Sequence, residues 1–132
     1  MSHDIRIKKG LDIKLKGEAE KTSEQAKRSN FYILRPQDFH GIIPKLILKV
    51  GSKVKAGEAV FYDKSNEHVK FVSPVSGEIV EIARGEKRKI LSIKIQADET
   101  DSFIQHDILN LEKAKSEDLK SLLLNSGCWP FI

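Results

Sequence analysis

Two stretches of the sequence decide the fold: VGSKVKAGEAV at residues 50–60 and VSPVSGEIVEI at residues 72–82. Each combines a short stretch of alternating apolar residues with glycines that allow tight turns at positive φ, at Gly51, Gly57 and Gly77. Pro74 fixes φ at the start of the second turn. The two stretches therefore predict hairpin-like units that close into a small, flattened β-barrel.

The sequence around these stretches continues the pattern of short strands. Apolar residues alternate with polar ones at a period of two, which is typical of half-buried strands. There is no helical period between the strands and no room for crossover helices, so a parallel doubly wound sheet is excluded. We expect a mainly β fold with strands near residues 5–7, 13–15, 31–34 (a fully buried strand), 59–62, 69–72, 78–82 and 90–95.

The sequence changes character after residue 97. We expect residues 1–97 to form the β domain, with an exposed loop at 16–30, and residues 98–132 to form an acidic linker and a C-terminal amphipathic helix. Ser116 is placed to cap that helix and Gly127 to end it. Because bulky apolar residues follow Gly127, we also expect the natural sequence to continue beyond Ile132 into a further domain.

Composition narrows the function further. The 132 residues include 23 Lys and Arg, 19 Asp and Glu, one Cys and 7% aromatics. The mixed charges and sparse aromatics argue against a nucleic-acid-binding surface. The sequence contains no apolar run of about 20 residues and no signal-peptide pattern, so we expect a soluble intracellular domain. One cysteine and four scattered histidines predict no disulfide and no metal site.

The paired glycine motifs resemble the barrel-sandwich hybrid of biotinyl and lipoyl carrier domains. That resemblance implies a lysine that becomes acylated at the tip of the hairpin between the two motifs. We expect this tip near residues 65–68, with Lys64 and Lys70 beside it and no lysine at its centre. A modified carrier domain is therefore disfavoured and stays as an alternative.

A second resemblance covers nearly the whole chain, to the A-type subunit of the sodium-translocating NADH:quinone reductase. It is also closer than the similarity to the C-type subunit of the related ferredoxin-linked electron-transport complex, which remains an alternative. The resemblance rests on the ordered motifs IRIKKGLD (5–12), DFHG (38–41), the glycines at 51 and 57, VKF (69–71), SPVSG (73–77), RGEKR (84–88) and LLLNSGCW (122–129).

This resemblance implies a structural and docking domain within a peripheral part of the complex. Its partners would be the other subunits, at the cytoplasmic face of the bacterial inner membrane. NADH, flavins, an iron–sulfur centre and quinone would belong to the whole complex, with no cofactor bound in this part. We therefore expect no turnover from this chain alone.

The loop Asp38, Phe39, His40 and Gly41 is the candidate quinone-proximal segment that the resemblance implies. An Asp–His pair can donate a proton to a reduced quinone. The simpler interpretation, which we favour, is that Asp38 and His40 bond the loop backbone while Phe39 fills the core.

Two groups of residues are candidates for contacts with a partner. The first is the basic turn of Arg84, Lys87, Arg88 and Lys89, which could meet a phosphate or an acidic surface, or simply be a solvated hairpin turn. The second is the apolar end of the chain, with Trp129 and Phe131. Cys128 has no basic neighbour in sequence that would activate a thiol, so no catalytic residue is predicted.

Overall fold

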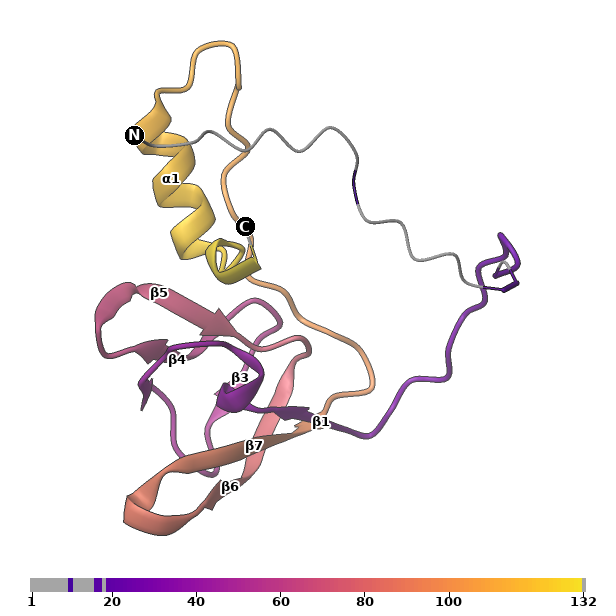
Figure 1. Ribbon diagram of the computed structural model, residues 1–132, viewed down its shortest axis with the longest axis vertical. Coiled ribbons are helices and arrows are strands. Elements are labelled where there is room, and N and C mark those ends of the chain that lie inside the picture. Colours follow the sequence, from indigo (N-terminus) through magenta and orange to yellow (C-terminus); the bar gives the residue numbers. More distant parts are fainter. Residues whose placement is uncertain (1–9, 11–15, 18, 132) are drawn as a thin grey trace, which may run out of the picture.

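The computed structural model describes residues 10, 16–17 and 19–131; the strands expected at 5–7 and 13–15 lie outside these residues. In the described part, two curled antiparallel sheets face each other (Figure 1). One sheet has the strand order β1-β7-β6-β3 and the other β2-β4-β5. The strands are β1 (Phe31–Leu34), β2 (Pro44–Leu46), β3 (Lys53–Val54), β4 (Ala59–Asp63), β5 (Asn66–Val72), β6 (Gly77–Arg84) and β7 (Ile90–Ala97).

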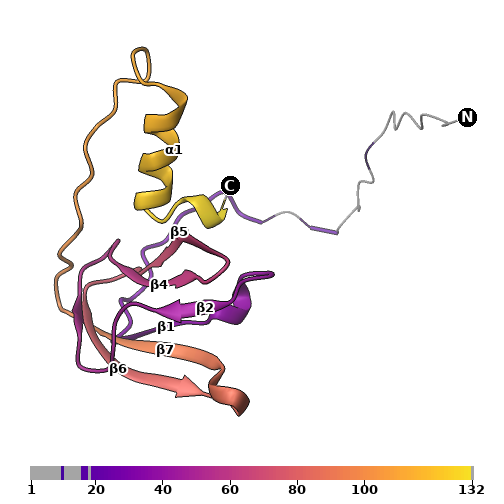
Figure 2. The ribbon, with the colours of Figure 1, turned by 90° about the vertical axis from the view of Figure 1, so that its left-hand side faces the viewer.

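The core lies between the two sheets, and the alternation in the sequence accounts for it. Ile93 and Ile95 of β7 have no exposed surface, whereas Gln96 beside them is exposed. In β4, Val60 and Phe61 are both fully buried, at a shift in the register between β4 and β5. Figure 2 shows the two sheets from a second direction, with the strands of one stacked over those of the other. The mainly β barrel-sandwich fold predicted from the sequence is confirmed. The buried core consists of Val54, Val60, Phe61, Phe71, Val75, Ile79, Ile90, Ile93 and Ile95.

The first strand differs from its prediction. Among the described residues β1 pairs with β7 alone, at the edge of its sheet, and alternate side chains of β1 are exposed. Tyr32 and Leu34 pack against the core, while Phe31 and Ile33 are 45% and 57% exposed. The prediction of a fully buried strand at 31–34 was wrong, because an unbroken apolar run does not reveal that a strand lies at the edge of a sheet.

The glycines of the two decisive stretches have two different roles. Gly51 and Gly57 adopt φ of 83° and 85°, which only glycine reaches without strain. Gly77 is not at positive φ, contrary to expectation. It is required for a different reason: a Cβ there would overlap the backbone carbonyl of Gln96, whose carbon would lie 2.8 Å away. Close backbone approach, and not turn geometry, makes glycine necessary at position 77.

The β4–β5 hairpin turns earlier than the sequence suggested. β4 ends at Asp63 and β5 begins at Asn66, so Lys64 and Ser65 form the turn. The Asp63 carboxylate accepts hydrogen bonds from the N–H groups of Ile43 (2.9 Å) and Ser65 (3.1 Å), which lower the pKa of Asp63. The expected tip at 65–68 was therefore misplaced, and Lys64 lies within the turn.

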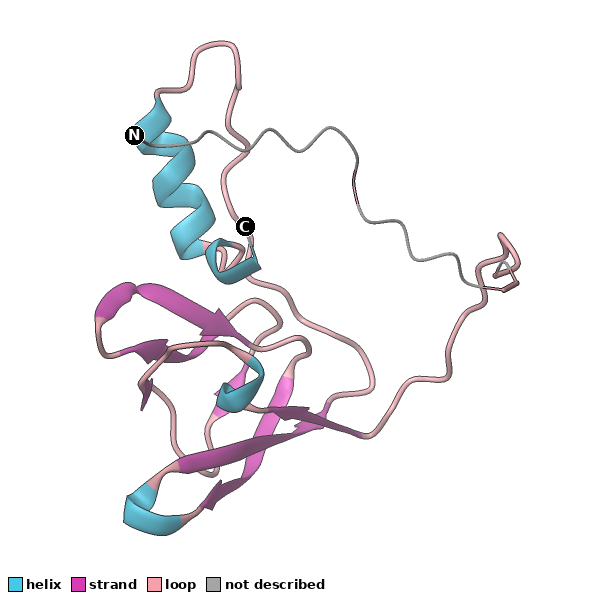
Figure 3. Cartoon of the chain, in the orientation of Figure 1, coloured by secondary structure: helices cyan, strands magenta, loops and turns pink. Residues whose placement is uncertain are grey.

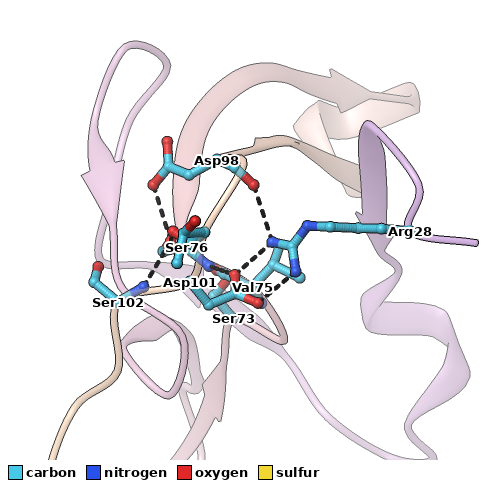
Figure 4. A network of polar contacts seen from close by, with 8 residues as sticks. Arg28, Ser73, Val75, Ser76, Asp98, Asp101 and Ser102 are labelled. Atoms are coloured by element: carbon cyan, nitrogen blue, oxygen red, sulfur yellow. Dashed lines mark hydrogen bonds and ion pairs between the residues drawn. The ribbon is translucent and has the colours of Figure 1, made fainter.

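A network of polar contacts joins the segment that precedes β1 and the segment that follows β7 to the start of β6 (Figure 4). The Arg28 guanidinium binds both carboxylate oxygens of Asp101, at 2.6 and 2.7 Å, and the Asp98 carbonyl at 3.0 Å. The fully buried Ser76 donates its N–H to Asp101 (2.9 Å) and its hydroxyl to Asp98 (2.9 Å). We call Arg28, Ser76, Asp98, Asp101 and Ser102 the Ser76 junction.

The Ser76 junction joins two segments that the sequence marks only as polar. Residues 19–30 contain no helix or strand and are exposed, and Arg28 anchors them. After β7 the chain stays against the barrel, because Ala56 and Phe103 form a parallel bridge and Ile104 N–H donates to the Ala56 carbonyl at 2.9 Å. Contacts with the barrel thus continue past residue 97, where the linker was expected to begin.

The C-terminal helix α1 (Ser116–Asn125) follows a long loop, drawn in pink in Figure 3, and packs near β5. Ser116 is its first residue and not its cap; instead Asp118 accepts a hydrogen bond from the Lys115 N–H at 3.1 Å. Gly127 ends the helix at φ 73° and is buried against Val72. Within the described residues, no helix is long and apolar enough to cross a bilayer.

Candidate functional site

The segment between β1 and β2 places the first set of candidate residues. Arg35 and the buried Pro36 lead into the 3₁₀ turn η1 (Pro36–Asp38), in which the Asp38 N–H donates to the Arg35 carbonyl at 3.0 Å. Proline is favoured there because its φ suits the first turn and no N–H is lost. The turn directs Phe39 toward the core, where its ring lies edge-on to Phe71 with centroids 4.5 Å apart.

Phe39 belongs to a row of aromatic rings that reaches the end of the described chain. Phe61 and Phe71 are stacked in the core, 4.6 Å apart, and Phe131 approaches Phe39 edge-on at 5.7 Å. Phe131 nevertheless remains 74% exposed. The rings border a cavity of about 430 Å³, the aromatic cleft, lined by Asp38, Phe39, His40, Ile42, Val69, Phe71, Pro130 and Phe131.

Asp38 and His40 lie at the rim of the aromatic cleft, and both are exposed. The contact found for the Asp38 carboxylate is with Arg35, at 3.8 Å between Oδ2 and Nε, and not with His40. Phe39 packs against the core, as the simpler interpretation of this loop requires. Gly41 turns the chain at φ 72° toward β2. A quinone-proximal role for residues 38–41 stays a prediction.

The second set of candidates lies in the turn between β6 and β7. The Gly85 N–H donates to the Lys89 carbonyl at 2.8 Å and closes the loop over η2 (Glu86–Arg88). Lys87 and Arg88 have φ of 52° and 60°, a region that side chains other than glycine, asparagine and aspartate rarely occupy. The Arg84 guanidinium donates to the Arg88 carbonyl at 3.2 Å and braces the turn.

The basic turn faces the beginning of β2 across a second cavity, of about 350 Å³. We call it the basic cleft. Figure 2 shows the start of β2 and the β6–β7 turn on the same side of the two sheets. Arg84, Arg88 and Lys89, all expected from the sequence, are brought together here, whereas Lys87 is outside. The lining residues are Ile43, Pro44, Lys45, Leu46, Arg84, Arg88, Lys89 and Ile90.

The two clefts lie close together. A third cavity, of about 280 Å³, shares Phe39, His40 and Ile42 with the aromatic cleft and Pro44, Lys89 and Ile90 with the basic cleft. The candidate residues of the η1 loop, the basic turn and Phe131 therefore border one continuous surface. Sequence spacing alone could not show this, because the three groups lie in widely separated parts of the sequence.

Cys128 and Trp129 directly precede the lining residues Pro130 and Phe131 but do not themselves line the clefts. Trp129, in η3 (Trp129–Phe131), is half-buried, and the Lys120 ammonium lies 5.9 Å from its ring centroid. Such a contact is a weak cation–π interaction. Cys128 is exposed and unpaired. Neither residue lines the cavities bordered by the other candidates.

The described residues offer no group of three or more His, Cys, Asp or Glu side chains that could hold a metal ion. Ser73 and Ser76, the buried polar side chains, are both hydrogen-bonded within the protein. The site's chemistry is therefore that of exposed cations beside apolar and aromatic surface. Such a surface suits recognition of another molecule.

A family model, the NqrA N-terminal barrel-sandwich hybrid domain, matches residues 5–98. The chain belongs to this family. Relatives named as the A-type subunit of Na(+)-translocating NADH-quinone reductase extend the similarity: the one from Marinomonas sp. (strain MWYL1) is 35% identical over 126 residues, and the one from Pseudomonas aeruginosa (strain UCBPP-PA14) is 36% identical over 127. These alignments cover 94% and 95% of this chain but 28% of each relative.

This NqrA-type domain contains cleft residues that the sequence analysis did not nominate. The sequence assigns Ile43, Lys45 and Leu46 to no strand or site. The pairing of β2 with β4 places Lys45 and Leu46, with Ile43 beside them, opposite the basic turn. One signal was available: Ile43 is an isoleucine in a stretch bounded by Gly41 and Pro44, and a bulky apolar residue in a loop is often exposed for contact. Ile43 is 57% exposed.

Proposed function

We propose that this chain is the N-terminal part of the A-type subunit of a sodium-translocating NADH-quinone reductase and serves as a docking domain within that complex. The observation that carries the proposal is the identity of about 35% with relatives of that name along 94% of the chain. The family assignment also favours this subunit over the alternative from the ferredoxin-linked complex. In this proposal the chain works at the cytoplasmic face of the inner membrane through its partner subunits.

The surface described above supports a docking role. Cations of the basic turn and the exposed Phe131 border one row of clefts, and aromatic and arginine side chains are the residues most enriched at the centres of protein interfaces. The proposal assigns the redox groups to the rest of the complex, as the resemblance to this subunit implies.

Co-purification tests the docking role. The chain, carrying an affinity tag, is co-expressed with the other subunits of its reductase, and the membranes are solubilised in mild detergent. We expect those subunits to be recovered with the tagged chain. The matched control is a tagged biotinyl-type domain of similar size. Recovery of the chain without any of the other subunits would contradict the docking role.

Turnover provides a second test. The purified chain should show no quinone-dependent oxidation of NADH, because the proposal places the redox centres in other parts of the complex. The reductase that contains it should show this activity. Activity of the isolated chain would overturn the assignment as a non-catalytic part.

A contribution to quinone binding is a second candidate role. It is favoured by the aromatic cleft, whose flat rings and volume of about 430 Å³ suit a quinone ring, with Asp38 and His40 at its rim. Ubiquinone-1 titrated into the chain should quench the fluorescence of Trp129, which is next to the lining residue Pro130 in sequence. His40→Ala should weaken the quenching and His68→Ala should not. Equal quenching in both variants would remove this role.

The carrier alternative can be tested through Lys64, because the structure places this lysine in the hairpin turn. We expect the mass of the chain, purified from cells that make biotin and lipoate, to equal that of the unmodified sequence. An added biotinyl or lipoyl mass, lost in Lys64→Arg, would replace the docking role by the carrier role.

A further inference from the structure

We propose that the basic cleft binds an extended acidic segment of a partner polypeptide, with one apolar side chain of that segment seated between the cations. The proposal rests on the proposed docking function and specifies the chemistry of the partner. Four observations carry it: the charge of the cleft, its apolar floor, the free edge of β2 and the fixed geometry of the basic turn.

The charge of the basic cleft is of one sign. Arg84, Arg88 and Lys89 line it, and none of its described lining residues is acidic. The fourth cation, Lys45, lies 5.5 Å from the ring centroid of Tyr62, and its hydrogen bond to Tyr62 raises its pKa. Arg84 donates to the Arg88 carbonyl, but among the described residues no ion pair is found for Arg84, Arg88 or Lys89. Glu86, the acid of this turn, does not line the cleft. Clustered like charges repel one another unless a partner supplies the opposite charge. Carboxylates on the bound segment would do so.

The floor of the basic cleft is apolar. Ile90 is only 6% exposed and belongs to the core, whereas Ile43 at the rim is 57% exposed. Pro44 and Leu46 complete the apolar part of the lining. A concave apolar site ringed by cations accepts a protruding side chain, whereas the surface of a lipid bilayer is too flat to enter a cavity of about 350 Å³. The geometry therefore favours a polypeptide over a membrane.

β2 adds a backbone contribution, because it is the edge strand of its sheet among the described strands. The Ile47 N–H donates to Val60 and the Lys64 N–H to Ile43, and the pattern alternates along an antiparallel pair. The N–H and C=O of Leu46 therefore point away from β4, to the free edge. An extended peptide can pair with such an edge, while Pro44, which has no N–H, limits the pairing to a short stretch.

Hydrogen bonds fix the backbone of the basic turn, and the Arg84 side chain, in the absence of a partner. The Gly85–Lys89 hydrogen bond of 2.8 Å closes the turn, and the Arg84 guanidinium is tied to the Arg88 carbonyl at 3.2 Å. Lys87 and Arg88 keep their positive φ within this closed loop. Preorganisation of this kind reduces the entropy lost on binding and would account for a strained backbone at this turn.

Peptide titration followed by NMR tests the proposal on the chain itself. The probe is a capped peptide of alternating Glu and Leu, six residues long, added to the ¹⁵N-labelled chain in about 0.05 M salt. We expect shifts concentrated at residues 43–46 and 84–90. The same peptide with Gln in place of Glu should bind at least about tenfold more weakly, and about 0.5 M salt should weaken the acidic peptide similarly.

Two triple variants identify the surface. Arg84→Glu/Arg88→Glu/Lys89→Glu should abolish binding of the acidic peptide. The matched control, Lys49→Glu/Lys53→Glu/Lys55→Glu, changes the net charge equally at exposed lysines outside the described cavities and should bind as the unmodified chain does. Dispersed amide spectra establish that both variants fold. Equal loss in the two variants would show non-specific charge attraction and overturn the proposal.

Vesicles distinguish the membrane as the other anionic surface. Vesicles of phosphatidylcholine with and without about one-third phosphatidylglycerol are added in the same salt. Vesicle binding that depends on Arg84, Arg88 and Lys89, without peptide binding, would overturn the proposal in favour of lipid. Peptide binding without vesicle binding supports it.

Co-purification separates this proposal from the docking function on which it rests. If the chain recovers its reductase subunits and the cleft variant does not, both stand. If both chains recover the subunits equally, the docking role stands and the basic cleft is not its contact. If neither chain recovers any of them, the docking function itself fails.

Discussion

The two ends of the β6–β7 ribbon differ in how their charged side chains are paired. At the Ser76 junction, Arg28 meets Asp101 and every charged partner is supplied from within the chain. At the basic turn, Arg84, Arg88 and Lys89 surround a cleft to which no acidic described residue contributes. At the Ser76 junction the charged groups bind segments of the same chain to one another. At the basic turn the positive charges are available to another molecule. In this domain, charged side chains that are paired within the chain hold its segments together, and charged side chains without an ion pair are available to a partner.

The largest effect on stability is expected from a glycine-to-alanine substitution, made once at each end of the β6–β7 ribbon. Gly77→Ala should destabilise the protein by about 3 kcal/mol or more, because its Cβ would overlap the Gln96 backbone, which cannot move aside. At Gly85 the nearest atom to a new Cβ is a side-chain carbon of Leu91 at 3.2 Å, and that side chain can shift. Gly85→Ala should therefore change stability by about 1 kcal/mol or less. Urea unfolding measures both, and equal effects would contradict the account of Gly77.

A second test concerns another fastening point, where the end of α1 meets β5. Gly127→Ala combines positive φ with an overlap on the stiff Val72 side chain, whose Cγ2 would lie 2.8 Å from the new Cβ. It should release α1 from the barrel, with a loss of about 2–3 kcal/mol measured by amide exchange in the helix.

Gly51→Ala is the control for backbone strain at this point. Gly51 has φ 83° but open space around it, so alanine there should lose only the strain of about 1–2 kcal/mol. If the two variants lose equal amounts, the contact with Val72 does not hold the helix.

The pH dependence of stability tests the ion pair at the Ser76 junction. The hydrogen bond from Arg28, assisted by the Ser76 N–H, lowers the pKa of Asp101 to about 2. A carboxyl group with a pKa depressed by folding stabilises the protein above its unfolded pKa of about 3.9, and this contribution is lost as the pH falls toward 2. Urea unfolding between pH 7 and pH 2 should therefore show a decline that is smaller in Asp101→Asn, in which the contribution of Asp63 remains.

Two controls accompany the Asp101 variant. Glu99→Gln, an exposed acid outside the Ser76 junction, should decline with pH as the unmodified protein does. Lys89→Gln, at the opposite end of the ribbon, should leave stability at pH 7 within about 0.5 kcal/mol of the original. A stability loss in Lys89→Gln larger than that in Asp101→Asn would reverse the comparison between the two ends.

The smallest expected effect comes from backbone strain at the basic turn. Lys87 has φ 52°, so Lys87→Gly should relieve strain and stabilise the protein by up to about 0.5 kcal/mol after the entropy of glycine is subtracted. Lys89 has φ −58°, and Lys89→Gly should destabilise by a similar amount. Thermal unfolding of the two variants provides the measurement, and a destabilised Lys87→Gly would show that the turn is not strained.

Much of the barrel could be predicted from the sequence. Alternation placed β5, β6 and β7 to within a few residues, because a period of two is typical of a strand with one buried face. The apolar run at residues 59–62 placed β4. Gly127 was correctly predicted to end α1. These features depend on neighbours in sequence, which a single sequence displays.

The features that could not be predicted depend on residues distant in sequence. The edge position of β1 follows from its pairing with β7, and the need for glycine at position 77 from the Gln96 carbonyl. Arg28 and Asp101 are 73 residues apart and look like ordinary surface charges until the fold joins them. In the candidate site, the sequence named Arg84, Arg88 and Lys89, but the apolar residues facing them come from β2 and required the structure.

The ion pair between Arg28 and Asp101 determines how the domain would respond to tension on the chain. The segment before β1 meets the segment after β7 at this ion pair, directly beside the pairing of β1 with β7. Tension on the segment before β1 would therefore be carried first by the Arg28–Asp101 ion pair and then by the β1–β7 hydrogen bonds. The basic turn, at the other end of the β6–β7 ribbon, would keep its shape.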